Sequence, residues 1–159
     1  MSHPRVLLVD DDANVLIALR RTLQAEGYEI FTATAAPLAL ELMAVDPVDV
    51  VVSDHEMPGM NGVELSALLS RHWPDTVRVM LTGVPGCEVG LSALERGRIF
   101  RLLTKPWSDR DLRATVRQAI AHRQRRLESR ELLSTLPRRT DSQLHTLVGV
   151  VADGFGGTQ

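Results

Sequence analysis

The sequence predicts an α/β fold in which five parallel strands alternate with five helices. Short aliphatic runs without polar alternation, such as Val6-Leu7-Leu8-Val9 and Val50-Val51-Val52, are typical of strands buried on both faces. Between such runs, apolar residues recur at helical spacing, and Gly or Pro marks the ends of the segments. This alternation implies helices on both faces of the sheet and right-handed crossovers.

Each element follows from its own local pattern. The stretch 13–26 has apolar residues on one helical face, and Gly27 ends it. The stretch 28–33 alternates partially, which is typical of an edge strand. Ser108 or Asp109 caps the last helix, whose first turn is acidic. The expected strands are 6–9, 28–33, 48–54, 77–82 and 99–104, and the expected helices are 13–26, 36–44, 63–72, 88–96 and a long one from 109.

The composition indicates one globular domain with an appendage. Of the 159 residues, 44% are hydrophobic and 24% are charged, while aromatic residues make up only 4%. The single Cys87 forms no internal disulfide. We see no signal-peptide pattern and no apolar run near the about 20 residues that a membrane span needs, so we expect a cytoplasmic protein without membrane contact.

Polar residues follow four of the predicted strands. Asp10-Asp11 follow the first, Asp54 ends the third, Thr82 ends the fourth and Lys105 follows the fifth. Because the carboxyl ends of parallel strands share one edge of a sheet, these side chains are expected to converge on one cleft. Three crowded carboxylates favour a divalent cation with oxygen ligands, Mg²⁺ or Mn²⁺. A carboxylate nucleophile, a metal, an ammonium and a hydroxyl form a set that handles a phosphoryl group.

Four stretches carry a resemblance to a known family. They are VLLVDDD (6–12), VVSDHEMPGMNGVEL (51–65), VMLTG (79–83) and LLTKPW (102–107). Over roughly residues 4–122 the sequence resembles the receiver domains of two-component response regulators. The resemblance implies a flavodoxin-like sheet in the order 2-1-3-4-5. The LLTKPW ending is similar to receivers of hydrogenase regulators and of cyclic-dinucleotide phosphodiesterases.

The resemblance also implies roles for single residues. Asp54 would accept a phosphoryl group from a sensor histidine kinase or a phosphotransfer protein. Asp10, Asp11, Asp54 and the backbone carbonyl of Glu56 would bind Mg²⁺. Thr82 would be the switch hydroxyl, and Lys105, before a cis peptide bond to Pro106, would contact the phosphoryl group. A domain of this kind modifies itself, so no turnover substrate is expected.

Two positions depart from the family pattern. Many members have Tyr or Phe three residues before the lysine, whereas this chain has Leu102, which puts an aromatic-coupled switch in doubt. Glu56, two residues after Asp54, adds a carboxylate beside the site. We expect no chemical role for His55, because consecutive side chains at a strand end diverge.

The last 59 residues differ from the rest in charge. Residues 1–100 carry 7 basic and 14 acidic side chains, whereas residues 101–159 carry 11 basic and 6 acidic ones. We therefore divide the chain into a receiver domain, 1–122, and a helical extension with a mobile tail, 123–159. The helical pattern continues to Ser134, and one or two further turns are possible at 142–151. The extension is a solvated linker or a helix that forms a homodimer or docks a partner. Without a helix-turn-helix pattern, we do not expect direct nucleic-acid binding.

Three classes of function remain open at this point. The first is a phosphorylation-dependent switch. The second is a phosphorylation-independent adaptor that dimerises or docks through the C-terminal helix. The third is a metal-dependent phosphatase, for which Glu56 has the required spacing from Asp54 although the rest of that pattern is absent.

Overall fold

The computed structural model describes residues 2–84 and 86–137. Its elements are β1 (Arg5–Val9), α1 (Ala13–Leu23), the 3₁₀-helix η1 (Gln24–Glu26), β2 (Glu29–Ala33), α2 (Ala36–Val45), β3 (Val50–Asp54), α3 (Gly62–His72), β4 (Val77–Thr82), α4 (Glu88–Glu95), β5 (Arg101–Thr104) and α5 (Asp109–Thr135).

The five strands form one parallel sheet in the order β2-β1-β3-β4-β5, so the flavodoxin-like prediction is confirmed. The central strands β3 and β4 are buried along their whole length, as their unbroken aliphatic runs predict. β2 and β5 are the two edges of the sheet, and each begins with an exposed charged residue, Glu29 and Arg101.

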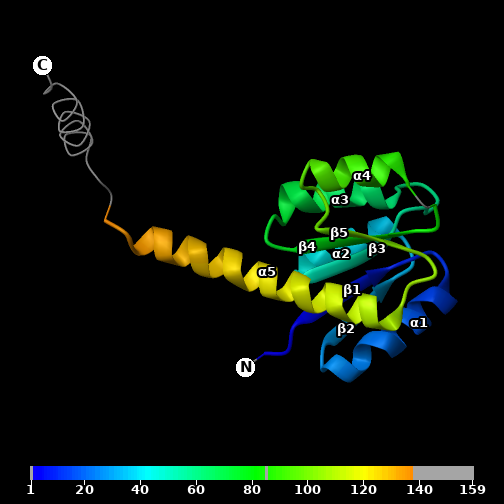
Figure 1. Cartoon of the computed structure of the whole chain (residues 1–159), viewed down its shortest axis with the longest axis horizontal. Coiled ribbons are helices and arrows are strands. Elements are labelled where there is room, and N and C mark those ends of the chain that lie inside the picture. The colour runs from blue at the N-terminus through cyan, green and yellow to red at the C-terminus, as the bar shows by residue number, and fades with distance from the viewer. Residues whose placement is uncertain (1, 85, 138–159) are drawn as a thin grey trace, which may run out of the picture. The chain divides into compact units, whose positions relative to one another are not determined.

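Helices cover both faces of the sheet, as Figure 1 shows. On one face α1 and α5 pack through Leu16, Leu19, Leu112 and Val116 against the strands. On the other face α2 and α3 form a second core, which includes Met43. A smaller third cluster lies between α4 and the β4–β5 pair. Both layers leave the carboxyl ends of the strands free for the side chains that follow them.

Two helix termini show how local chemistry sets the element bounds. Asp12 caps α1, because its carboxylate accepts a hydrogen bond from the amide of Asn14 at 2.9 Å. The predicted single helix 13–26 is instead divided into α1 and η1. Gly27 follows with φ +80°, a left-handed conformation that glycine adopts at little cost.

The long C-terminal helix is confirmed and runs from Asp109 to Thr135. Ser108 caps it, since its hydroxyl oxygen accepts from the amide of Asp111 at 3.3 Å. By its internal contacts the chain divides into two units, with the division between Leu127 and Glu128. The domain boundary at 122 stays a prediction. The further helical turns at 142–151 and the mobile tail fall outside the described residues.

The described helices differ from helices that cross a bilayer. Not one of them within residues 2–84 and 86–137 combines the length and the apolar character that a span needs.

Candidate functional site

The predicted polar residues at the strand ends converge around one ammonium group. The Lys105 Nζ atom lies 2.8 Å from Asp10 Oδ2 and 3.2 Å from Asp54 Oδ1. Both carboxylates are buried, with 1% of Asp10 and 6% of Asp54 exposed. Lys105 begins the β5–α5 loop, and its peptide bond to Pro106 is cis. One cation therefore partly neutralises two buried carboxylates that come from different strands.

Asp11 completes a cluster of three carboxylates. One carboxylate oxygen each of Asp10, Asp11 and Asp54 lies within 4.8 Å of the others. Oxygens bound to a single Mg²⁺ lie at most about 4 Å apart, because each Mg–O distance is about 2.0–2.1 Å. Asp11 is exposed, so packing does not fix the position of its carboxylate. The donor set and its spacing fit a hard divalent cation.

The charges in this cluster change two pKa values. Burial raises the pKa of Asp54, and the negative charge of Asp10 raises it further; Lys105 and the backbone amide of Glu56 oppose this shift. Burial works to lower the pKa of Lys105, but the hydrogen bond to Asp10 and the charges of Asp10 and Asp54 outweigh it and raise that pKa. Lys105 is therefore protonated at neutral pH. The ionised form of Asp54 is energetically unfavourable in this buried place, and a bound cation would stabilise it.

Thr82 is fully buried next to this cluster. Leu81 pairs with Asp54 in the β3–β4 ladder, so Thr82 lies one residue beyond the level of Asp54. Its hydroxyl oxygen accepts from the amide of Val84 at 3.1 Å. A hydroxyl has one O–H to donate, and within the described part of the chain that donor makes no hydrogen bond to Asp54. Thr82 therefore lies at the strand end predicted for it, and its O–H donates to no group among the described residues.

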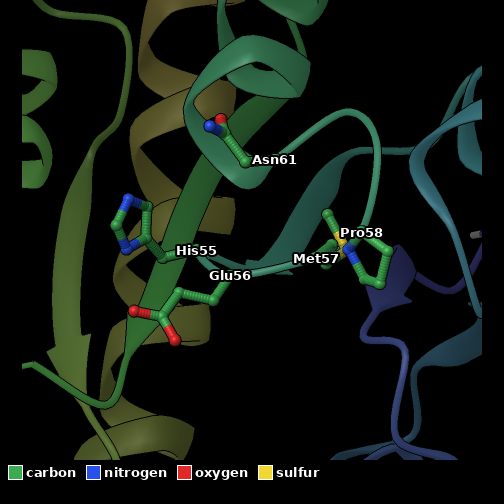
Figure 2. Close-up of a pocket in the computed structure, with 5 residues that line it drawn as sticks. All are labelled: His55, Glu56, Met57, Pro58 and Asn61. Atoms are coloured by element: carbon green, nitrogen blue, oxygen red, sulfur yellow. The ribbon is translucent and has the colours of Figure 1, made fainter.

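The loop after β3 adds contacts that the sequence analysis missed. The amide of Glu56 donates to the Asp54 carboxylate, and a pocket of about 390 Å³ is lined by His55, Glu56, Met57, Pro58 and Asn61 (Figure 2). The His55 ring lies with its Nδ1 atom 3.8 Å from the Cys87 sulfur, which caps α4. The His55 ring thus lies against the residue that caps α4. The predicted role of the Glu56 backbone carbonyl as a metal ligand stays a prediction.

Leu102, where an aromatic residue is common in the family, packs toward α4. It is half-buried beside Met80, Ala93 and Ile99. A Cβ atom placed on Gly90 of α4 would lie 3.1 Å from a Leu102 methyl carbon, so helix and strand are in close contact there. This position therefore couples β5 to α4 through aliphatic packing.

Comparison with known proteins gives this geometry a family. Residues 6–117, more than half of the chain, match the family described as "Response regulator receiver domain". The chain belongs to the response regulator receiver domain family. The receiver is 36% identical to the hydrogenase transcriptional regulatory protein HoxA of Cupriavidus necator, over 72% of this chain and 24% of that protein. It is 35% identical to the C4-dicarboxylate transport transcriptional regulatory protein DctD of Pseudomonas aeruginosa, over 87% of this chain and 30% of that protein.

Solved structures agree with this assignment. The receiver is similar to the signal receiver domain of an HD domain-containing protein from Pseudomonas fluorescens, with a TM-score of 0.73, 36% identity, and 77% of this chain and 98% of that one covered. The chain spans only about a quarter to a third of the length of the curated relatives named above. The match to HoxA confirms the predicted likeness to hydrogenase regulators.

The raised pKa of Asp54 predicts how stability depends on pH and metal. A carboxyl group with a raised pKa in the folded chain destabilises the fold when it is ionised; this cost is complete above the folded pKa and disappears as the pH falls to the unfolded value, near 3.8. In the metal-free protein, Asp54→Asn will therefore raise the melting temperature at pH 7.5, and the gain will shrink as the pH is lowered. Added Mg²⁺ will stabilise the wild type more than the variant. Thermal melts across a pH series with EDTA or Mg²⁺ measure both effects, and an equal response to Mg²⁺ in both proteins would contradict the ligand set.

Proposed function

We propose that residues 1–122 form a phosphorylation-dependent signalling switch in which Asp54 accepts a phosphoryl group. A sensor histidine kinase or a phosphotransfer protein would supply that group. The single observation that carries the proposal is the buried Asp54 carboxylate, which lies 3.2 Å from the Lys105 ammonium and within 4.8 Å of the Asp10 and Asp11 carboxylates.

The chemistry follows from this arrangement. An ionised Asp54 oxygen attacks the phosphorus atom of a phosphohistidine; an O–P bond forms, the P–N bond breaks, and the imidazole leaves with a proton from water. Lys105 stabilises the transferring oxygens through its charge, which it does not lose at neutral pH. A Mg²⁺ or Mn²⁺ ion held by Asp10, Asp11 and Asp54 would supply further positive charge.

The new phosphoryl group would then change the surface. Its oxygens can accept a hydrogen bond from the O–H of Thr82. This buried hydroxyl accepts from the Val84 amide, and it donates to no group among the described residues. Movement of Thr82 draws in the β4–α4 loop, and α4 packs on β5 at the contact between Gly90 and Leu102. The output is a shift of the α4 and β5 surface or a change in oligomeric state.

Incubation with acetyl phosphate tests this function directly. In the presence of Mg²⁺ the chain will gain one phosphoryl group, visible as a mass increase or as a retarded Phos-tag band. With EDTA the uptake will fall strongly, because the carboxylates of the site then lack their cation. Uptake that is equal with and without a divalent metal would refute the metal-dependent mechanism.

An adaptor function through the C-terminal helix has an observation of its own. Leu132 and Leu133 are each 67% exposed, and Leu136 is 60% exposed. Clustered apolar side chains on a helix are typical of protein contact surfaces. The relevant partner would be a second copy of this chain or another helix.

Sedimentation distinguishes the two functions. If the helix alone dimerises the chain, Leu133→Arg will shift the protein to monomer, with or without beryllofluoride, an analogue of the phosphoryl group. Ser134→Arg adds the same charge at an exposed position on the opposite face of the same helix and serves as the control. If the switch governs assembly, the oligomeric state will instead change when beryllofluoride is added.

A further inference from the structure

A second pocket lies at the edge of the sheet opposite to Asp54, where β4 and β5 begin. It has a volume of about 220 Å³ and is bounded by the end of α4 and by α5. The side chains that define its chemistry are Arg78, Leu94, Ile99, Phe100, His122 and Arg126. Two arginines, a histidine and an aromatic ring thus line one small cavity. It lies at the end of the strands opposite to the carboxylate cluster of Asp10, Asp11 and Asp54.

Arg78 brings a buried positive charge to this pocket. The residue is the second of β4 and only 7% exposed. Its guanidinium donates to three backbone carbonyls, those of Arg98 and Thr76 at 2.6 Å and that of Gly97 at 3.4 Å. A guanidinium has five N–H donors, so two are not used by these bonds. No carboxylate among the described residues pairs with Arg78, although a buried charge is costly unless it is paired.

The electrostatic environment of the pocket is positive. Burial lowers the pKa of Arg78, and the neighbouring charge of Arg126 lowers it further. Burial likewise lowers the pKa of His122, and the charges of Arg126 and Arg125 add to that shift. The charged neighbours that act on both groups are cations, so an anion placed among them would be attracted.

The remaining walls of the pocket are apolar and aromatic. The rings of Phe100 and His122 stack, with centroids 4.9 Å apart and an angle of 29° between their planes. Ile99 is buried, and Leu94 is partly exposed at the end of α4. A ligand with only charge would leave these surfaces unused, whereas one with an apolar or aromatic body would cover them. The small volume excludes anything as large as a dinucleotide.

We propose that this pocket binds a small organic anion. Its carboxylate or phosphate group is held by the guanidinium groups of Arg78 and Arg126, and its apolar part packs against Phe100. Bound there, the anion joins the end of α4 to α5. This inference is independent of phosphorylation at Asp54, because the two sites lie at opposite ends of the strands.

The test is an NMR titration of the full chain at constant pH with EDTA present, so that the carboxylate cluster holds no metal. Benzoate and phenyl phosphate are the probes that separate a carboxylate from a phosphate ligand, and inorganic phosphate tests the charge alone. We expect saturable shifts of the Gly97, Phe100 and His122 amide signals with one or both aromatic probes. Inorganic phosphate will bind more weakly, because it leaves the aromatic wall uncovered.

Matched variants show whether the pocket is responsible. Arg126→Gln will weaken binding about tenfold, the loss expected for one charge-assisted hydrogen bond. Arg125→Gln removes the same charge from the neighbouring position of α5, outside the pocket, and will change affinity far less. Phe100→Leu will weaken the aromatic probes and leave inorganic phosphate unchanged. Arg126 is chosen over Arg78, whose side chain holds the backbone of β4 and the α4–β5 loop together. Absence of saturable shifts, or equal losses in the Arg125 and Arg126 variants, would overturn the proposal.

Discussion

Asp54→Asn will take up no phosphoryl group from acetyl phosphate in the presence of Mg²⁺. An amide is a poor nucleophile, and the substitution also removes one of the three carboxylates that fit a divalent cation. We expect the rate of uptake to fall by at least about a thousandfold, the scale on which loss of an essential catalytic group acts. Mass spectrometry after timed incubation measures it, with circular dichroism as the check that the variant is folded.

Asp12→Asn is the matched control for that experiment. Asp12 belongs to the same run of three aspartates, but its carboxylate caps α1 through the amide of Asn14. Asparagine caps helices about as well as aspartate, so this variant will fold and accept the phosphoryl group. Uptake that persists in Asp54→Asn, or that disappears equally in both variants, would show that another group accepts the phosphoryl group.

Gly62→Ala will destabilise the chain more than the same change at any other glycine that the structure describes. A Cβ atom at Gly62, the first residue of α3, would collide with the backbone carbonyl of Asp54 and approach the His55 Cα atom to 3.0 Å. Backbone cannot rotate away as a side chain does, and the Gly62 amide is tied to the His55 carbonyl at 2.9 Å. We expect a loss of about 3 kcal/mol in the free energy of unfolding, or a melting temperature roughly 10 °C lower.

The same substitution will also reduce phosphoryl uptake, because relief of the collision must move the Asp54 backbone. Gly83→Ala is the control, since a Cβ atom there meets nothing within 4 Å and the backbone has ordinary φ. That variant will stay within about 0.5 kcal/mol of the wild type in urea unfolding. Similar unfolding curves for both variants would mean that α3 is not packed as closely on the β3 loop as described.

Much of the site was predictable because it depends on topology. Asp10 and Lys105 each follow a strand and Asp54 ends one. Because parallel strands end at one edge, their meeting required only the assignment of strands from aliphatic runs. The strand order came from the family resemblance, since alternation of elements alone allows other orders. The cap at Asp12 was predictable from local chemistry.

The rest depends on distances that no sequence pattern contains. The amide of Glu56 donates to the Asp54 carboxylate, and His55 lies against Cys87, 32 residues further along the chain. Arg78 is a charged residue within the otherwise aliphatic run of β4. Its burial is possible because its guanidinium donates to the carbonyls of Gly97 and Arg98 in the α4–β5 loop. The α-helix α1 gives way to the 3₁₀-helix η1 in the single turn Gln24–Glu26 before Gly27, and the sequence pattern does not distinguish these two helix types.

The two edges of the sheet have a consequence for how the protein behaves at high concentration. β2 has five residues and β5 only four, so each leaves a short row of backbone groups for another chain to pair with. Glu29 and Arg101, exposed at the first positions of these strands, would have to lose water if a foreign strand docked beside them. Short edge strands with exposed charges therefore disfavour strand-to-strand association of the domain.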